Sequence, residues 1–350
     1  MFVRNCWYVA AWGSEVGREP FARTILGEPV VLYRTESGRA VALEDRCCHR
    51  NLPLSMGRIE GDAVRCGYHG LKFDPTGACI EVPGQSAIPP GARVRSYPLI
   101  ERWKLLWIWM GDASRLDESL LPGWHYIDDP RFAVAHGNDA KPLPMKSHWE
   151  LNNDNLLDLS HVVYVHPTTL GAHALDFPIT TERFERKVRM SRWIPNSHPI
   201  PLWAKYLNHS GNVDRWQDTD CEFPSHCTVD VGFAPVGRLR PGDDRDHPDA
   251  LRLRALITAT PETETSSFMF YAQCRNFAVA DEEMTRKFVR DVRVIFMEDV
   301  TIMEGQQRNL SRRPDAPRID INSDAPHLAM RQLVRRFAAE EGRVTGRSAA

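Results

Sequence analysis

The feature that most constrains this chain is a pair of short segments that each supply one thiol and one imidazole. Residues 47–49 read C-C-H and residues 66–69 read C-G-Y-H, with sixteen residues between His49 and Cys66. Each segment is polar or Gly-rich and lies between apolar runs, which is typical of a loop that joins two strands. Two thiolates and two imidazoles on two such loops can hold a metal centre between them.

The spacing of the four ligands indicates which centre they suit. Structural zinc usually takes its ligands as C-x2-4-C and H-x3-5-H pairs, whereas here Cys47 pairs with His49 and Cys66 pairs with His69. A [2Fe–2S] cluster uses such a set directly, because one iron takes both sulfurs and the other takes both nitrogens. The pattern resembles the Rieske motif, and a zinc site is the alternative. The intervening Cys48 is expected to point away from the irons.

The composition of the 350-residue chain is that of an ordinary globular protein with room for two domains. The net charge is −2, so neither nucleic acid nor a membrane is an expected partner. No uncharged apolar run reaches the roughly eighteen residues of a spanning helix, and residues 1–7 lack the features of a secretory signal. We therefore expect a cytoplasmic protein whose eight cysteines are thiols or metal ligands.

Residues 1–113 are expected to form a small antiparallel β domain that presents the two ligand loops. Its expected strands are residues 30–34, 40–43, 71–74, 78–80, 97–100 and 105–110. Residues 114–145 contain several prolines and have little hydrophobic periodicity, so we interpret them as a connection.

Residues 146–350 are expected to form a second domain, with helices at both ends and strands between them. The first helix runs from residue 150 to about residue 165 and ends before Pro167. The other expected elements are strands at 227–231 and 267–271, a charged loop at 237–248, helices at 281–309 and 328–341, and a disordered tail at 343–350.

The first helix of this second domain carries Asn155, Asp158, His161 and His166 in an otherwise apolar segment. On a regular helix Asp158 and His161 lie near one face, but His161 and His166 diverge by about 140°. Both imidazoles can bind one metal only if the helix is distorted, for instance by a π-bulge. An isolated H-x4-H pair more often marks two packed core histidines. The accompanying Asp158 and the cluster motif upstream favour a metal site.

A D-x2-H-x4-H sequence downstream of a Rieske motif resembles the α-subunits of Rieske non-haem iron oxygenases. The resemblance covers nearly the whole chain and is closest to the enzymes that act on vanillate, dicamba and toluenesulfonate. The segments that carry it are residues 7–10, 68–71, 154–158, 260–262, 275–277, 298–299 and 306–309. The resemblance implies an α+β fold, with an N-terminal all-β Rieske domain followed by a helix-grip catalytic domain that has an antiparallel sheet and flanking helices.

The resemblance also implies which residues hold two iron centres. The ligands of the [2Fe–2S] cluster would be Cys47, His49, Cys66 and His69. His161 and His166 would join one carboxylate in a facial triad on Fe(II). The matching carboxylate is Asp299, and the neighbouring Glu298 is its competitor. Asp299 is preferred because it lies towards the apolar side of its helix.

Asp158 is implied to act between subunits rather than as a ligand. It would bridge His161 of one subunit and a cluster histidine of the next in a head-to-tail homotrimer. The reason is that the two centres of one chain lie on separate domains, which we expect to be too far apart for fast electron transfer. The alternative is that Asp158 only orients His161 within its own chain. Asn155 is a candidate hydrogen-bonding residue near the iron, and a purely structural amide is the alternative.

We therefore expect the terminal oxygenase of a monooxygenase system that uses O2 and electrons from a separate NADH-dependent flavin or ferredoxin-type reductase. The chain itself has no G-x-G-x-x-G after a strand and no plant-type ferredoxin cysteine run. The favoured reaction is O-demethylation of a vanillate-like aromatic acid, which releases formaldehyde. Methyl hydroxylation of a toluenesulfonate-like compound is the alternative. The rival classes are a Rieske electron-transfer protein and a zinc-stabilised ligand-binding protein.

The substrate pocket is expected between the middle strands and residues 170–210. Its polar and aromatic candidates are Trp203, His198, His209 and His226, although residues of these types are more often surface or packing residues. Dicamba-handling relatives carry a histidine just before the T-P-E segment, where this chain has the apolar Ile257. Dicamba is therefore not the expected substrate.

Overall fold

The computed structural model describes residues 2–170, 176–200 and 211–347, and the chain divides into two compact units. Unit 1 comprises Met1–Leu121, Ala140–Pro142 and Thr260–Glu264, and unit 2 comprises Pro122–Asp139, Leu143–Ala259 and Thr265–Ala350. The segments with the two thiols and two imidazoles lie in unit 1, and the two further histidines lie in unit 2.

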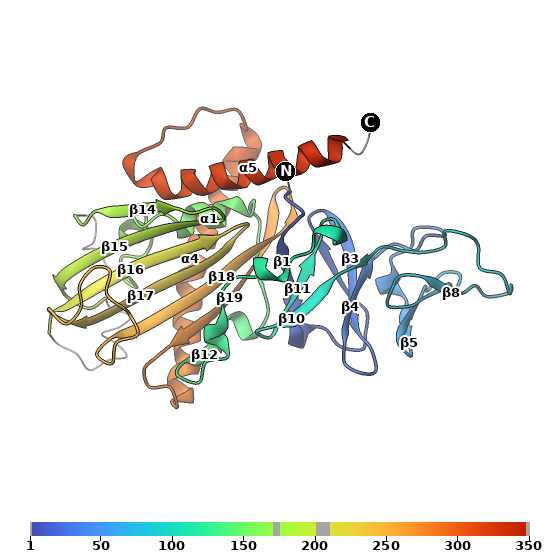
Figure 1. Ribbon diagram of the computed structural model, residues 1–350, viewed down its shortest axis with the longest axis horizontal. Helices are drawn as coiled ribbons and strands as arrows, with labels where there is room; N and C mark the ends of the chain where they lie inside the picture. Colours follow the sequence, from blue (N-terminus) through green and yellow to red (C-terminus); the bar gives the residue numbers. More distant parts are fainter. Residues whose placement is uncertain (1, 171–175, 201–210, 348–350) are drawn as a thin grey trace. The chain divides into compact units, whose positions relative to one another are not determined.

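Unit 1 is built from three small antiparallel sheets (Figure 1). The first has the order β1-β11-β10, the second β2-β3-β4-β9 and the third β5-β6-β7-β8. The strands are β1 (Trp7–Trp12), β2 (Phe21–Ile25), β3 (Glu28–Arg34), β4 (Ala40–Glu44), β5 (Arg58–Glu60), β6 (Ala63–Arg65), β7 (Lys72–Phe73), β8 (Cys79–Glu81), β9 (Ser96–Tyr97), β10 (Leu99–Arg102) and β11 (Leu105–Trp109). The strands expected at 30–34 and 40–43 are confirmed as the hairpin β3–β4, and those expected at 71–74 and 78–80 as the hairpin β7–β8.

The core of unit 1 includes the two cysteines that are the expected cluster ligands. Cys47 and Cys66 belong to one cluster of buried side chains, together with Tyr33, Leu54 and Phe73. Full burial of an apolar side chain such as Leu54 or Phe73 stabilises the fold by about 1.5–3 kcal/mol. The ligand loops are thus anchored by the core rather than carried on flexible tips.

Unit 2 is dominated by one antiparallel sheet of eight strands. Seven follow the order β12-β19-β18-β17-β16-β15-β14, and β13 pairs with β19 beside β12. The strands are β12 (Ala133–His136), β13 (Leu143–Met145), β14 (Ile179–Arg183), β15 (Lys187–Ser197), β16 (Val213–Glu222), β17 (His226–Pro235), β18 (Leu251–Thr263) and β19 (Ser266–Arg275). The expected strands at 227–231 and 267–271 and the loop at 237–248 are confirmed. Residues 114–145, which we interpreted as a connection, supply β12 and β13.

The main helices of unit 2 are α1 (Glu150–Leu156), α2 (Val162–Val165), α4 (Glu282–Arg312) and α5 (Ala325–Arg347). The helix α4 crosses one face of the sheet, and α5 packs on β14, β15 and α1 (Figure 1). Asp281 caps α4 by accepting a hydrogen bond from the Met284 N–H at 2.8 Å. Phe288 and Val292 lie on its buried face, as the periodicity predicts.

Two expectations about helices are wrong. The single helix expected at 150–165 is interrupted between α1 and α2, because the Asp158 carboxylate accepts hydrogen bonds from the N–H and hydroxyl of Ser160, both at 2.6 Å. Such local side-chain bonds compete with helical ones. The last helix is longer than expected, since α5 extends to Arg347 through most of the tail expected to be disordered. Residues 348–350 lie outside the described residues.

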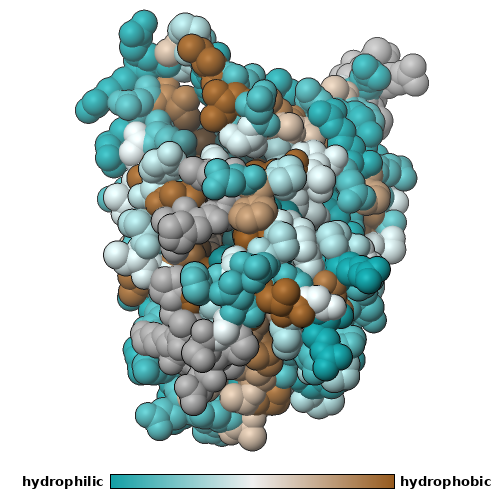
Figure 2. All heavy atoms as spheres, turned by 90° about the vertical axis from the view of Figure 1, so that its left-hand side faces the viewer, coloured by the Kyte–Doolittle hydropathy of each residue, from teal (hydrophilic) through white to brown (hydrophobic). Residues whose placement is uncertain are grey.

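Short 3-10 helices connect these elements. They are η1 (Gly13–Glu15), η2 (Leu54–Met56), η3 (Ala113–Arg115), η4 (Glu118–Leu120), η5 (His125–Ile127), η6 (Gly137–Asp139) and η7 (Asn322–Asp324). Within the described residues, no helix has the length and apolar character needed to cross a membrane. On the face drawn in Figure 2, hydrophobic side chains lie in small groups between hydrophilic ones.

Candidate metal centres and active-site cavity

The two ligand loops of unit 1 share one backbone pattern. In each loop the cysteine N–H donates to the carbonyl five residues later, and the N–H four residues later donates back to the cysteine carbonyl, at N···O distances between 2.8 and 3.2 Å. That fourth residue is Asn51 in the first loop and Gly70 in the second, and their φ angles of 59° and 74° lie in the left-handed region. Such a conformation suits Gly and Asn. The two loops therefore present Cys47 and Cys66 in equivalent positions.

The four expected cluster ligands divide into a buried pair and an exposed pair. Cys47 and Cys66 are only 1% and 2% exposed, whereas His49 and His69 are exposed, with ring centroids 4.6 Å apart. Burial, together with the neighbouring Cys66 thiol, raises the pKa of Cys47 to about 11 in the metal-free protein. An inner pair of sulfurs and an outer pair of nitrogens fit a [2Fe–2S] cluster whose two irons have different ligands.

Residues that the sequence analysis did not single out hold these loops in place. Asp45 precedes the first loop and accepts hydrogen bonds from the Ser55 N–H at 2.7 Å and hydroxyl at 2.6 Å. Arg65 precedes the second loop and donates to the Gly70 carbonyl at 2.7 Å. A Cβ on Gly67 would lie 2.7 Å from a backbone carbonyl oxygen, so glycine is required by this close approach. Each loop is therefore pinned at its start by a charged side chain.

In unit 2 the structure brings together the three residues expected to bind Fe(II). Asp299 Oδ1 lies 3.0 Å from His166 Nε2 and 3.4 Å from His161 Nε2. The three ligand atoms are within 4.8 Å of one another, and His166 and Asp299 are buried. Two imidazoles and one carboxylate converging in this way fit the facial triad of non-haem iron enzymes.

The end of α2 directly before His166 makes this convergence possible. His161 lies at the start of α2 and His166 directly follows its end, so the two rings do not have to share one regular helix. Their ring centroids are 5.4 Å apart. The distortion that the spacing required is therefore the end of α2 at His166, whose φ and ψ of −119° and 43° are not helical, rather than a π-bulge.

Glu298 and Asp299, the two carboxylates that compete in the sequence, bind different atoms of the same imidazole. Glu298 Oε2 lies 2.7 Å from His166 Nδ1, on the opposite side of the ring from Asp299. A carboxylate at the outer nitrogen fixes the tautomer and orientation of a metal-binding histidine. The geometry thus assigns Glu298 to orientation and leaves Asp299 as the carboxylate at the metal-binding position.

Asp158 and Asn155 both lie beside the triad. Asp158 Oδ2 is 3.8 Å from His161 Nδ1, and Asn155 Nδ2 donates to Asp299 Oδ1 at 3.0 Å. The expected hydrogen bond of Asn155 near the iron site is therefore present in the structure. Asp158 faces the outer nitrogen of His161, as either of its two expected roles requires.

The charges around the triad favour a bound cation. Burial alone lowers the pKa of His161, but the carboxylates of Asp158 and Asp299 outweigh this and raise the pKa to about 9. The pKa of His166 is likewise raised, because Asp299 and Glu298 outweigh its burial. Burial raises the pKa of Asp299, but the two imidazoles hold it below its ordinary value. In the metal-free protein at neutral pH, a proton on His161 therefore takes the place of the cation.

A cavity of about 150 Å³ adjoins the triad between the sheet and α4. Most of its lining is apolar and comes from Val229, Val231, Phe233, Leu253, Ala255, Ile257, Val292, Ile295 and Phe296. The uncharged polar residues of the lining are Asn155, Gln217, Thr219 and Gln273, and Arg215 adds a positive charge. An apolar cavity with a few polar groups is suited to a small organic ligand.

Of the four pocket candidates proposed from the sequence, the two that the structure describes, His198 and His226, do not line this cavity. His226 is buried elsewhere, with its Nδ1 2.9 Å from Thr258 Oγ1, and His198 is exposed. Trp203 and His209 lie outside the described residues. Ile257, the apolar residue that the resemblance places near the histidine of dicamba-handling relatives, does line the cavity.

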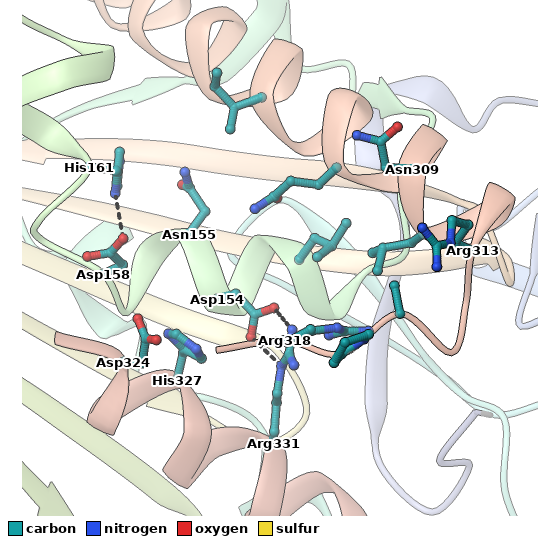
Figure 3. Close-up of a pocket in the computed structure, with 16 residues that line it drawn as sticks. Asp154, Asn155, Asp158, His161, Asn309, Arg313, Arg318, Asp324, His327 and Arg331 are labelled. Carbon is teal, nitrogen blue, oxygen red and sulfur yellow. Dashed lines mark hydrogen bonds and ion pairs between the residues drawn. The ribbon is translucent and has the colours of Figure 1, made fainter. Parts of the chain in front are cut away.

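A second, more polar cleft of about 460 Å³, the outer cleft, opens beside Asp158 and His161 (Figure 3). Asp158 and His161 line both this cleft and the inner cavity. Asp154 and Arg331 both line this cleft and form an ion pair, with Asp154 Oδ1 2.9 Å from Arg331 Nε. The Asp158–His161 pair thus connects an open cleft with the apolar cavity.

Two family models match this chain. Residues 6–98 match the Rieske [2Fe–2S] domain, and residues 145–340 match the vanillate O-demethylase oxygenase C-terminal domain. The chain is 43% identical to the iron–sulfur subunit of the toluene-4-sulfonate monooxygenase system of Comamonas testosteroni, over 97% of this chain and 98% of that protein. It is 33% identical to a vanillate O-demethylase oxygenase subunit of Pseudomonas sp., over 97% of this chain and 96% of that protein.

The fold also matches that of a solved protein. A crystal structure of dicamba monooxygenase bound to 3,6-dichlorosalicylic acid superposes with a TM-score of 0.88 and 31% identity, covering 97% of this chain and 99% of that chain. The expected α+β fold, a β domain followed by a domain with an antiparallel sheet and helices, is therefore confirmed.

Proposed function

Since the chain belongs to the family of Rieske non-haem iron oxygenase α-subunits, we propose that it hydroxylates a methyl group of a small aromatic acid of the toluenesulfonate type. The protein is the oxygenase component of a monooxygenase system for aromatic compounds, and its cofactors are a Rieske [2Fe–2S] cluster and a mononuclear non-haem iron. A separate reductase supplies its electrons. The electron-transfer and zinc-binding alternatives are set aside by this family membership.

The choice of methyl hydroxylation corrects the order of the two reactions expected from the sequence. O-demethylation of a vanillate-like substrate was favoured there, with methyl hydroxylation of a toluenesulfonate-like compound as the alternative. The identity of 43% to the toluene-4-sulfonate monooxygenase subunit, against 33% to the vanillate enzyme, supports the alternative. Motifs shared by all these enzymes do not distinguish the two substrates, so the sequence motifs alone could not decide between the two reactions.

We assign the cluster to the four residues of the unit 1 loops, Cys47, His49, Cys66 and His69. The mononuclear iron is assigned to His161, His166 and Asp299, and their convergence within 4.8 Å is the single observation that carries this proposal. Iron bound there supplies activation of O2, so that with two electrons and two protons one oxygen atom enters the methyl C–H bond and the other leaves as water.

The chain's own residues contribute positioning and exclusion of water. Glu298 fixes the ring of His166, and Asn155 fixes the carboxylate of Asp299. The apolar lining packs against the aromatic ring and keeps water from the reacting methyl group. These contributions place the methyl C–H bond next to the triad, which is the main task of the protein in cofactor chemistry.

We further propose that the electrons enter through Asp158 in a head-to-tail homotrimer. The outer cleft is open at Asp158 and His161, so a cluster histidine of a neighbouring copy has a carboxylate available there. One carboxylate that accepts N–H bonds from both imidazoles would hold both rings. The alternative, in which Asp158 only orients His161, predicts a different outcome for the Asp158 variant described below.

The proposed reaction is tested by incubating the oxygenase with a reductase, NADH and O2 and analysing the products. With toluene-4-sulfonate or 4-methylbenzoate we expect the benzylic alcohol, and with 18O2 the new hydroxyl should carry the label. Vanillate is the comparison substrate, and its demethylation is read from the release of formaldehyde. Efficient formaldehyde release from vanillate, with no alcohol from either methyl substrate, would restore the demethylase assignment.

A further inference from the structure

The strand β16 presents a row of polar side chains to the active-site cavity. Arg215, Gln217 and Thr219 occupy alternate positions and all three line the cavity, as expected for residues on one face of a strand. Among the described lining residues, Arg215 is the only arginine or lysine. The rest of the surrounding wall from β17 and β18 is apolar, so this row is a distinct feature of the cavity.

Arg215 has no carboxylate partner within the described part of the chain. Its Nη1 donates to the His198 carbonyl at 3.4 Å, and burial together with the nearby Arg192 lowers its pKa to about 10, which leaves it charged at neutral pH. On the opposite face of the sheet, in contrast, Arg189 is held by Asp220 at 2.7 Å. An unpaired guanidinium in an apolar cavity is costly unless an anion joins it.

Gln217 supplies a second donor next to Arg215. Its Oε1 accepts hydrogen bonds from Arg192 Nε at 2.9 Å and Nη2 at 2.6 Å, which fixes the orientation of the amide. No acceptor among the described residues takes up its NH2 group, so this group is available as a donor. A fixed amide donor beside a guanidinium suits a ligand group that only accepts hydrogen bonds, such as a sulfonate or a carboxylate.

We propose that Arg215, assisted by Gln217, binds the oxyanion of the aromatic substrate and so determines both its specificity and its orientation. This inference rests on the proposed function and adds the group that recognises the acid. With the sulfonate or carboxylate bound at Arg215, the opposite end of the ring is left for the triad. Arg215 is thus a specificity-determining residue that touches substrate but not the reacting carbon.

Binding to the anaerobic iron-loaded enzyme tests this proposal without turnover. The ligands are toluene-4-sulfonate, 4-methylbenzoate and the neutral methyl 4-tolyl sulfone, measured by calorimetry against wild type, Arg215→Gln and Arg215→Lys. Arg189→Gln, an arginine on the other face of the same sheet, is the matched control. Loss of charge-assisted hydrogen bonds predicts that Arg215→Gln weakens binding of both anions by about 10- to 100-fold. Binding of the sulfone should change less than about threefold.

The conservative variant and the control test whether the loss of affinity comes from the charge at residue 215. Arg215→Lys should recover part of the anion affinity, and Arg189→Gln should leave it unchanged. The anion whose affinity falls more in Arg215→Gln, sulfonate or carboxylate, is the one that the site prefers. Equal affinities of Arg215→Gln and wild type for the anions, or an equal loss for the anions and the sulfone, would overturn the proposal. If Arg215→Gln does not fold, as judged from cluster absorbance and thermal midpoint, Gln217→Leu takes its place, with an expected loss of about 3- to 10-fold for the anions alone.

The proposed reaction and the proposed anion site fail in different ways. Binding of anions that depends on Arg215, without benzylic alcohol from any methyl substrate, would refute the reaction and leave the anion site standing. Formation of the alcohol with the same KM in wild type and Arg215→Gln would refute the anion site and leave the reaction standing. If the anion site holds, Arg215→Gln should raise KM for the two acids much more than it lowers kcat.

Discussion

His166 and Glu298 are joined at the ring nitrogen that faces away from the metal-binding position. His166 Nδ1 lies 2.7 Å from Glu298 Oε2, while its Nε2 lies 3.0 Å from Asp299 Oδ1. Two consecutive acidic residues of α4 therefore hold one imidazole from both sides. The pair explains why an E-D sequence at this point of the helix serves the site better than a single acid.

The two acids are expected to differ when each is replaced by its amide. Asp299→Asn removes the anionic ligand, so the mononuclear iron should be lost. Glu298→Gln removes only the orienting charge, so Fe(II) affinity should fall by about 10- to 100-fold. Anaerobic Fe(II) titration measures both, with the cluster absorbance as the internal reference. Loss of iron from Glu298→Gln but not from Asp299→Asn would reverse the assignment.

Replacing Asp158 by Asn tests the proposed route between subunits. If Asp158 bridges two imidazoles, both iron centres should remain bound, while oxidation of the reduced cluster by the neighbouring iron site slows by orders of magnitude. Rapid mixing of the reduced enzyme with O2 and substrate, followed at the cluster absorbance, measures this rate. Unchanged cluster oxidation with a weakened Fe(II) affinity would instead support orientation of His161 within one chain.

Replacing Asp230 is expected to lower the stability of unit 2. Asp230 lies on the opposite face of the sheet, where it accepts hydrogen bonds from Arg252 Nε at 3.0 Å, Arg254 Nε at 2.9 Å and Trp216 Nε1 at 2.9 Å. Its replacement by Asn removes one of the two carboxylates that pair with Arg252 and Arg254, the other being Asp246, so unfolding should become easier by about 1.5–3 kcal/mol. Urea unfolding checks this, and Glu282→Gln in an exposed ion pair should change little.

The pH dependence of iron binding follows from the raised pKa of His161. In the metal-free protein this pKa is about 9, so at pH 7 the ring carries a proton that Fe(II) must displace. Affinity for Fe(II) should therefore rise as the pH increases from about 6.5 towards 9 and stop rising above that range. Anaerobic calorimetry in two buffers of different ionisation enthalpy counts the released proton. A flat affinity without proton release at pH 7 would contradict this account.

The ligands of both centres could be predicted from the sequence because they lie in short, regular spacings. The four cluster ligands lie in two short segments, 47–49 and 66–69, and the two iron-binding histidines lie in a third, 161–166. The role of Asp299 could be predicted only from the helical periodicity around it and from the family resemblance. No local spacing connects it to the two histidines, which lie more than a hundred residues away. The structure places its carboxylate 3.0 Å from His166.

Other features depend on partners that are distant in the sequence. The strands β12 and β13 are too short to be recognised alone, and they exist because they pair with β19. The break at Asp158 comes from side-chain bonds to Ser160 that a helical pattern does not reveal. Arg215 became a candidate only when the cavity-facing side of β16 was known.

Iron content of wild type and His166→Ala tests the central assignment most directly. Anaerobically purified wild type should contain iron beyond that of the cluster, and His166→Ala should lose this extra iron and all product formation. The Rieske signal in electron paramagnetic resonance should remain intact in the variant. Full iron content and full activity in His166→Ala, or wild type whose iron is all in the cluster, would contradict the assignment.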